Sequence, residues 1–261
     1  MNERTKKIML LVGVVLLTIT SLYLILKPTV IDHFIINPRV VESATAEMAD
    51  VDTETLQKNQ KRIHNVVEKS EPKLETNDQG YSYPVTSDPS LSYDASAVSA
   101  IGEIPKDAAL NYDYMIGEVY MPRVGMHVPI LEGMSNENLW LGAGTMKPGQ
   151  TMGKDNYALA GHHMWDASQL FTPIMNSEVG DVVYVTDKSN VYEYKVSNMF
   201  VAQEGDGHLV NDVEAEQSES GAILTMVTCT DVWGSERYIV VAELSGQYSI
   251  DEAPQELQDL F

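Results

Sequence analysis

Two side chains near the end of the chain have the types and spacing of a nucleophilic site. Cys229 is the only cysteine, and Arg237, eight residues later, is the only arginine after Arg123. A thiolate is a strong nucleophile, and a guanidinium stays charged and offers five donors in a planar fork. An imidazole beside the thiol would supply the acid and base that acyl transfer also needs.

The residues around Cys229 and Arg237 predict how these two side chains are positioned. Ile223–Thr228 and Tyr238–Leu244 are apolar and β-branched, which is typical of strands. The polar stretch Asp231–Ser235 between them is typical of a turn. We therefore expect the thiol and the guanidinium to lie side by side at one rim of a sheet.

The stretch Asn156–His163 supplies two adjacent histidines at the end of a third predicted strand. Side chains alternate between the two faces of a strand, so Ala160 and His162 share one face. That face is small and would suit a groove for an extended peptide, whereas His163 shares the bulkier face. We expect His162 to be the general acid and base, with His163 as the second candidate.

Structural roles are the alternative interpretation of each of these residues. Cys229 could be a buried small hydrophobe, and Arg237 could form a surface salt bridge with Glu236 or Asp231. The two histidines could simply be exposed at a strand end. A metal site is not expected, because adjacent histidines point to opposite faces and no Cys or carboxylate spacing completes a ligand set.

The composition excludes several classes of function. The net charge of the 261-residue chain is −21, which disfavours nucleic acid as a partner, since phosphate binding needs a basic patch. One cysteine excludes an internal disulfide and a cysteine-cluster metal site. An acidic exterior domain without disulfides would suit a Gram-positive cell surface.

The N-terminus predicts a membrane anchor. Basic residues dominate Met1–Lys7, the predicted cytoplasmic tail, and Ile8–Leu26 has no charge and is long enough to cross a bilayer as a helix. A signal peptide is the alternative, with a small-x-small site at Ala44–Ala46, but that site lies far beyond the apolar run. The basic flank predicts that the N-terminus stays inside and that the remainder lies outside the cell.

Residues 27–92 are expected to be an extracellular linker or stalk, with a possible surface helix over residues 41–69. The stretch Ser70–Ser92 is rich in Pro, Ser, Asp and Gly, which is typical of a linker. Residues 93–250 are expected to form the catalytic domain, and residues 251–261 an acidic tail.

The pattern of this domain predicts an all-β fold. Many short strands separated by turns indicate an antiparallel sandwich or barrel. Short helices are expected over Asp94–Ala100, Glu137–Leu141 and Ser168–Met175. The predicted strands are Ile116–Met121, His127–Leu131, Asn156–Ala160, Val182–Thr186, Val191–Phe200, Ile223–Thr228 and Tyr238–Leu244.

Several motifs, taken together and in this order, resemble the class A sortases of the streptococcal type. The sequence AGH stands at residues 160–162, TMVTC at residues 225–229, and Arg237 follows after eight residues. The family's TLxTC signature is met with Met226 in place of Leu, a conservative apolar change. MPRVGMHVPILEG at residues 121–133 and LGAGTM at residues 141–146 extend the resemblance over about residues 97–250.

The resemblance implies a closed eight-stranded β-barrel and a membrane-anchored cysteine transpeptidase. Such an enzyme cuts an LPxTG sorting signal of surface proteins between Thr and Gly. It passes the acyl group to an amine of lipid II, the peptidoglycan precursor. Carried over by position, Cys229 is the nucleophile, His162 the acid and base, and Arg237 the residue that holds the substrate. Ala160 and Thr228 are expected to line the peptide groove.

No cofactor is expected, and a calcium site is not carried over, because Lys147 stands where the resemblance leads us to expect an acidic residue. Two alternatives stay open. A pilin-polymerising relative usually carries a lid loop and a second membrane helix, but Ser82–Asp94 has no Asp-Pro-aromatic sequence and Gly246–Phe261 is polar. A non-catalytic anchored barrel that binds wall peptides is the other alternative.

Overall fold

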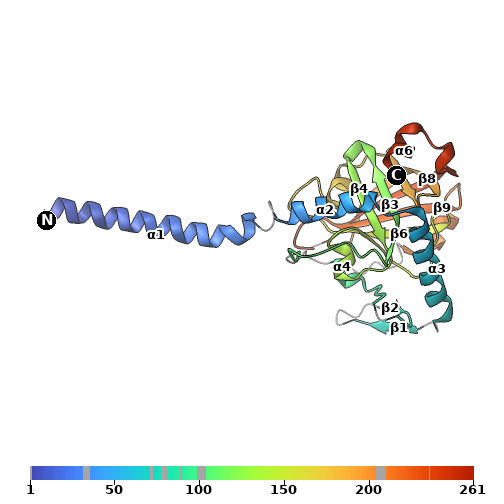
Figure 1. The fold of residues 1–261 in the computed structure, drawn as a ribbon, viewed down its shortest axis with the longest axis horizontal. Coiled ribbons are helices and arrows are strands. Elements are labelled where there is room, and N and C mark those ends of the chain that lie inside the picture. The colour runs from blue at the N-terminus through green and yellow to red at the C-terminus, as the bar shows by residue number, and fades with distance from the viewer. Residues whose placement is uncertain are drawn as a thin grey trace.

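A closed eight-stranded barrel forms the body of the protein, as the computed structural model in Figure 1 shows. The structure describes residues 2–31, 36–70, 73–77, 82–88, 90–98, 104–203, 210–234 and 236–261. Around the barrel the strand order is β10-β8-β7-β3-β4-β5-β6-β9, so the predicted closed barrel is confirmed. Its strands are β3 (Met115–Met121), β4 (Met126–Leu131), β5 (Ala143–Thr145), β6 (Asp155–Ala160), β7 (Val182–Thr186), β8 (Asn190–Ala202), β9 (Ala222–Cys229) and β10 (Arg237–Ser249).

Two of the neighbouring strand pairs in the barrel are parallel, namely β4 with β5 and β6 with β9. Strand β5 is the one barrel strand that the sequence pattern did not predict, because it is three residues long and consists of small side chains. Gly144 at its centre pairs with Ala160 of β6. A Cβ on Gly144 would lie 2.5 Å from the carbonyl oxygen of Gly133. The close approach of the backbone at Gly133 therefore requires glycine at position 144.

The barrel interior is filled by large side chains that alternate along the strands with outward-facing ones. Tyr157 and Leu159 on β6 and Tyr194 on β8 are almost completely buried. The same core cluster contains Val119, Val185, Leu224, Met226 and Val240 from other strands. The bulky face predicted for residues 157 and 159 is therefore the core face.

Helix α1 (Glu3–Ile31) contains one candidate membrane span, Glu3–Ile25. None of the hydrophobic window of that span is buried against the rest of the protein, and Figure 1 shows α1 projecting away from the barrel. By length and composition the helix can cross a bilayer. A core helix of a soluble protein would instead be buried, so its exposure is consistent with an anchor.

Residues 41–69 differ from the single surface helix that the sequence predicts. The chain forms α2 (Asn37–Ala49) and α3 (Thr53–Lys69), and the break falls at Asp52, whose side chain accepts from the Thr55 amide at 2.8 Å. An Asp that caps the first turn starts a new helix there. Both helices pack on the barrel through buried side chains, namely Val41, Ala44, Met48, Leu56 and Ile63. They are therefore part of the folded body and do not form a stalk.

The predicted linker over Ser70–Ser92 is also wrong where the structure describes it. Strands β1 (Lys73–Thr76) and β2 (Ser82–Val85) form an antiparallel hairpin. A short 3-10 helix, η2 (Ala95–Val98), follows where a helix over Asp94–Ala100 was predicted, and residues 99 and 100 lie outside the described residues. Within this segment η2 contacts α4 (Asn136–Leu139).

The remaining short elements include the C-terminal segment, which was predicted to be a tail. Residues 250–260 form the 3-10 helix η6 (Ile250–Glu252) and α6 (Gln255–Leu260), with Leu257 buried. The Phe261 ring lies edge-on to His127, with centroids 5.7 Å apart, so this end is docked on the barrel. The helix predicted over Ser168–Met175 is only η4 (Thr172–Asn176). Further short helices among the described residues are η3 (Pro122–Val124) and α5 (Val213–Glu216).

Candidate active site

Cys229 is the last residue of β9 and is only 1% exposed. Its sulfur donates a hydrogen bond to the carbonyl oxygen of Val98 at 2.9 Å. Its own carbonyl oxygen accepts a bond from Nδ1 of His163, also at 2.9 Å. The thiol is therefore held at the end of a barrel strand, under a segment that comes from before the barrel.

Arg237 is the first residue of β10 and pairs with Cys229 in the β9–β10 register. The predicted juxtaposition of the two residues at one rim of the sheet is confirmed. Arg237 is 6% exposed, and its Nη1 donates to the carbonyl oxygens of Gly234 at 3.0 Å and Glu236 at 3.4 Å. The connecting loop is closed by the Thr230 amide, which donates to the Glu236 carbonyl at 3.0 Å. Ser235, at the end of the predicted turn, lies outside the described residues.

His162 lies two residues beyond β6, which runs parallel to β9. The backbone on its N-terminal side is fixed by Gly161, whose amide donates to the Val227 carbonyl at 3.0 Å and whose carbonyl accepts from Thr228 Oγ1 at 2.8 Å. On its C-terminal side His163 bonds to Cys229. His162 is therefore held level with the Cys229 end of β9, and the residue is 3% exposed.

His163 makes a bond to the backbone of the candidate nucleophile. A carbonyl oxygen only accepts, so Nδ1 of His163 carries the proton in its bond to the backbone of Cys229. That bond connects the loop after β6 to the end of β9, so His163 has a structural role. His162 stays the candidate for proton transfer, and this role stays a prediction.

The two residues predicted to line the peptide groove are both buried but have different neighbours. Ala160 is fully buried in a small apolar cluster around the thiol. Thr228 is also fully buried, and its hydroxyl is engaged by the Gly161 carbonyl. The cluster around the thiol consists of Val98, Met134, Leu139, Ala160, Ala202, Val227, Cys229 and Ile239.

Sequence reasoning missed several residues beside this site. Val98 covers the sulfur, and no local pattern marks it, because it stands alone in a Ser- and Ala-rich stretch. Trp165 and Trp233 meet edge to face with ring centroids 5.8 Å apart. They come from the loops after β6 and after β9, and Trp233 is 72% exposed. The loop that carries His162 therefore meets the loop between Cys229 and Arg237 at an aromatic contact.

A second buried polar group lies near the cover of the thiol. Glu132 is buried, and burial raises the pKa of its carboxyl to about 7. The Tyr93 hydroxyl donates to Oε1 of Glu132 at 2.6 Å, which offsets part of that burial. Burial also raises the pKa of Tyr93 well above its ordinary value, so this phenol stays a donor.

No group of three or more His, Cys, Asp and Glu side chains that could hold a metal ion occurs among the described residues. Lys147, which stands where the resemblance leads us to expect an acidic residue, forms an ion pair with Asp212.

Comparison with known proteins assigns the family. The sortase domain model matches residues 119–245. Sortase A of Listeria monocytogenes is 35% identical over 160 residues, which cover 60% of this chain and 69% of the relative. Sortase A of Streptococcus agalactiae is 37% identical over 168 residues, which cover 60% of this chain and 66% of the relative. The solved structure of the Listeria monocytogenes enzyme aligns with a TM-score of 0.49 at 35% identity, covering 56% of this chain and 95% of that chain.

A closed barrel with a thiol at one strand end thus defines a β-barrel cysteine enzyme. The chain belongs to the sortase family, a family of cysteine transpeptidases.

Proposed function

We propose that this protein is a membrane-anchored transpeptidase that attaches surface proteins to the cell wall of a Gram-positive bacterium. It would recognise an LPxTG-type sorting signal and cut it between Thr and Gly. The acceptor would be an amine of lipid II or of the peptidoglycan cross-bridge. Helix α1 would anchor the enzyme with its N-terminus inside and the barrel outside.

The observation that carries this proposal is the register that collects three side chains at one end of β9. Arg237 of β10 pairs with Cys229 of β9, and the bonds of Gly161 and His163 to β9 hold His162 level with that position. Acyl transfer from a peptide uses a nucleophile, an acid and base, and a donor that stabilises the developing oxyanion, and these three residues are of types that can supply them.

In the first half-reaction the Cys229 thiolate would attack the carbonyl carbon of the Thr residue. Its oxygen gains negative charge, which the Arg237 guanidinium would stabilise, a contribution of about 3–4 kcal/mol for one well-aimed donor. The C–N bond to Gly then breaks, and His162 would protonate the departing amine. The product is a thioester between the surface protein and the enzyme.

In the second half-reaction the acceptor amine would attack the thioester carbon. The C–S bond breaks and the thiolate leaves. His162 would take up the one proton that the attacking amine loses as it becomes an amide. Only thiolate together with imidazolium starts the cycle, so the reactive enzyme carries both charges.

Mass spectrometry of the full chain in detergent tests the proposal. After incubation with an LPxTG peptide we expect an acyl adduct on Cys229, which triglycine converts into a ligated peptide. Cys229→Ala is the matched control and should give neither product. Circular dichroism verifies that the chain is folded. If the folded chain gives neither adduct nor product at millimolar peptide, the protein is better explained as a non-catalytic barrel that binds wall peptides.

A further inference from the structure

A second groove lies between helix α2 and the beginning of strand β4. Its volume is about 600 Å³, and we call it the α2 groove. Figure 1 shows α2 on the barrel beside β4, on the side from which α1 projects. The loop that follows His163 forms another wall. One face of α2 lines the groove, at the i, i+3, i+4, i+7 and i+8 spacing of a helix, through Pro38, Val41, Glu42, Thr45 and Ala46.

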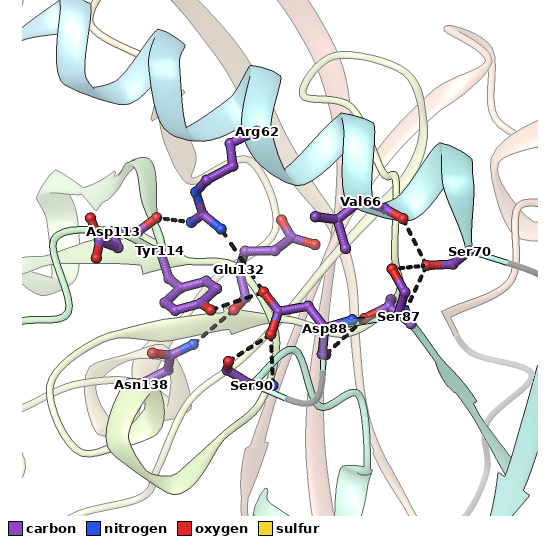
Figure 2. Close-up of polar contacts among 11 residues, drawn as sticks. Arg62, Val66, Ser70, Ser87, Asp88, Ser90, Asp113, Tyr114, Glu132 and Asn138 are labelled. Carbon is purple, nitrogen blue, oxygen red and sulfur yellow. Dashed lines mark hydrogen bonds and ion pairs between the residues drawn. The ribbon is translucent and has the colours of Figure 1, made fainter.

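The α2 wall of this groove is fixed on the barrel. Met48, near the end of α2, is buried, and its carbonyl oxygen accepts from Lys188 Nζ at 3.2 Å. Three residues connect α2 to α3, and α3 is fixed as well. Figure 2 shows Arg62 of α3 donating to the carbonyl oxygen of Asp113 and pairing with Asp88 at 4.0 Å. The groove is therefore present before any ligand binds, which is typical of binding sites.

Gln169 lines the groove from the loop and has a buried side-chain amide that the fold does not use. The residue is 9% exposed, and its Oε1 accepts no hydrogen bond from the described part of the chain. Its backbone is satisfied, because its amide donates to the Asp166 carbonyl at 3.2 Å and its carbonyl accepts from the Thr172 amide at 3.0 Å. A buried polar atom without a partner is rare and calls for an explanation, and a ligand is one. The last torsion of a glutamine side chain is broad, so a small rotation presents this amide to the groove.

The charges in the groove are negative. Glu42 is exposed on α2, and Asp166 is held in place because its Oδ1 accepts from the Ser168 amide at 2.9 Å and from the Ser168 hydroxyl at 2.7 Å. His127 also lines the groove, and its Nε2 lies 2.8 Å from the buried carboxylate of Glu118. Among the described residues that line the groove, none is Lys or Arg. The groove therefore suits a ligand that carries positive charge and N–H donors.

The α2 groove and the thiol lie on opposite sides of the loop that carries His162. In the barrel order β4-β5-β6-β9, the groove lies at β4 and Cys229 ends β9, and the His162 loop follows β6 between them. Leu170 lines the groove and pairs with His163 in an isolated bridge. The Phe171 amide, next in the chain, donates to the His162 carbonyl at 3.2 Å. A ligand in the groove therefore contacts the same loop that positions His162.

We propose that the α2 groove docks the peptide that carries the acceptor amine, and this identification rests on the proposed function. Glu42 and Asp166 attract the ammonium of that peptide, and the Gln169 amide bonds to its backbone. In the second half-reaction the donor is held as a thioester on Cys229, and the acceptor has to bring its amine to His162. The groove lies on the side of the His162 loop that the thioester leaves free.

The position of the groove along the chain agrees with an acceptor carried by a lipid. Pro38 lines the groove and is seven residues beyond the end of α1, so the groove begins close to the predicted membrane span. The two carboxylates raise the local concentration of the protonated amine. The free amine, after one proton is lost to solvent, attacks the thioester as in the second half-reaction. The groove thus determines how tightly the acceptor binds and leaves the chemistry unchanged.

Steady-state ligation by the full chain in detergent tests this inference, with saturating LPxTG peptide and increasing C-terminally amidated triglycine. Gln169→Leu replaces the amide by an apolar side chain of similar size, and we expect KM for the tripeptide to rise about tenfold. Glu42→Gln removes one charge and should raise KM about threefold. Glu54→Gln is the matched control, because Glu54 is exposed on α3 and does not line the groove, so its KM should equal that of the wild type.

A wild-type KM in both groove variants would overturn the inference. If Gln169→Leu fails to fold, a wild-type KM in Glu42→Gln alone is sufficient to overturn it. The effect of Glu42→Gln should also disappear at about 1 M salt, where the Debye length is about 3 Å. An effect that persists at this salt concentration would contradict attraction by charge.

Hydroxylamine separates docking of the acceptor from a change at His162 itself. This nucleophile is small and uncharged at neutral pH, so it releases the acyl adduct without using the groove. We expect the ratio of tripeptide to hydroxylamine reactivity, each measured as kcat/KM, to fall about tenfold in Gln169→Leu. An equal loss with both nucleophiles would mean that Gln169 acts only through the loop, and docking would be rejected.

Ligand-observed NMR of Cys229→Ala makes the result independent of the donor. Binding of the amidated tripeptide that weakens when Gln169→Leu is added, without any acyl adduct in the active chain, would retain the groove and reject the proposed donor. An acyl adduct without such binding, and with wild-type KM in the variants, would retain the proposed function and reject the groove. If phosphoethanolamine binds and the tripeptide does not, the groove takes a lipid headgroup and the inference is overturned.

Discussion

Arg237 lies directly across the β9–β10 pair from Cys229, so the two residues share one rung at the end of the barrel wall. The separation of their Cα atoms is therefore set by the ladder and does not depend on the loop between them. The loop, in turn, is held by the guanidinium through the carbonyls of Gly234 and Glu236. Arg237 therefore stabilises the β9–β10 loop through its guanidinium, and its backbone pairing with Cys229 keeps it beside the thiol.

Arg237→Lys should preserve the barrel and lower kcat/KM for an LPxTG peptide by about 10²-fold or more, because lysine keeps the charge but loses the planar fork. The measurement is steady-state kinetics on the full chain. Arg123→Lys is the matched control, since Arg123 of η3 pairs with Glu178 at 3.3 Å and with the buried Asp181, and its kinetics should be those of the wild type. Near-normal turnover of Arg237→Lys would remove the arginine from the mechanism.

Gly161→Ala should displace His162. A Cβ at this position would lie 2.6 Å from Cγ of Phe171, a buried ring that cannot move freely. Misplacement of a catalytic group by about 1 Å can cost about 10²-fold, so kcat/KM should fall by that order. Gly13→Ala, where a Cβ meets nothing within 4 Å, should leave kcat/KM unchanged. If both variants behave like the wild type, the position of His162 does not limit the reaction.

The extent to which the sequence predicts this site depends on how local the determining interactions are. Cys229 and Arg237 sit at the ends of two strands with clear periodicity and a short turn, so their pairing follows from nearby residues. Residues 70–98 are polar, and the determining contact of Tyr93 is with Glu132, 39 residues away. No pattern within the segment encodes that partner, so a linker was predicted where the chain is in fact attached.

The same limit applies to the fold. Strand β5 has only small residues, and its place is set by its neighbours β4 and β6. Burial of Glu118 and Lys188 is likewise invisible in the sequence, where charged residues are normally taken to be exposed. The two charges pair at 3.0 Å, and the Glu118 carboxylate also meets Nε2 of His127 at 2.8 Å.

Glu132 should make the stability of the protein depend on pH. Its carboxyl has an ordinary pKa of 4.5, which burial raises to about 7 in the folded protein. Between these values the folded state binds more protons than the unfolded state, so stability falls as pH rises. The contribution is fully present below pH 4.5, is lost as the pH rises through about 7, and amounts to at most about 3 kcal/mol.

The check is urea unfolding of the wild type and Glu132→Gln at several pH values from 4.5 to 8. Glutamine stays neutral, so the difference in unfolding free energy between the two proteins should grow with pH and then level off above about 7. A difference that does not vary with pH would mean that Glu132 titrates normally.

Lys188→Met should destabilise the protein by about 3–5 kcal/mol, because it removes the ammonium from the buried carboxylate of Glu118 and leaves that carboxylate with the His127 ring, whose Nε2 lies 2.8 Å from Oε2. The Lys188 ammonium lies 3.0 Å from Glu118 Oε1 and donates to the Met48 carbonyl at the end of α2 at 3.2 Å. Urea unfolding measures the loss.

Lys195→Met provides the comparison for Lys188→Met. Its ammonium is 57% exposed and 4.0 Å from Glu193, so the loss should be below about 1 kcal/mol. Equal effects of the two substitutions would show that burial of the Lys188 pair has no energetic consequence. A double variant, Glu118→Gln with Lys188→Met, should recover part of the loss by removing the uncompensated charge.

Helix α2 begins at Asn37 and packs against β4, so only residues 32–36 separate α1 from the folded body. Five residues span at most about 18 Å when fully extended. With α1 in the bilayer, this short connection would keep the barrel within a thin layer next to the lipid headgroups. A secreted polypeptide would then have to present its cleavage motif close to that plane, before it diffuses into the thickness of the wall.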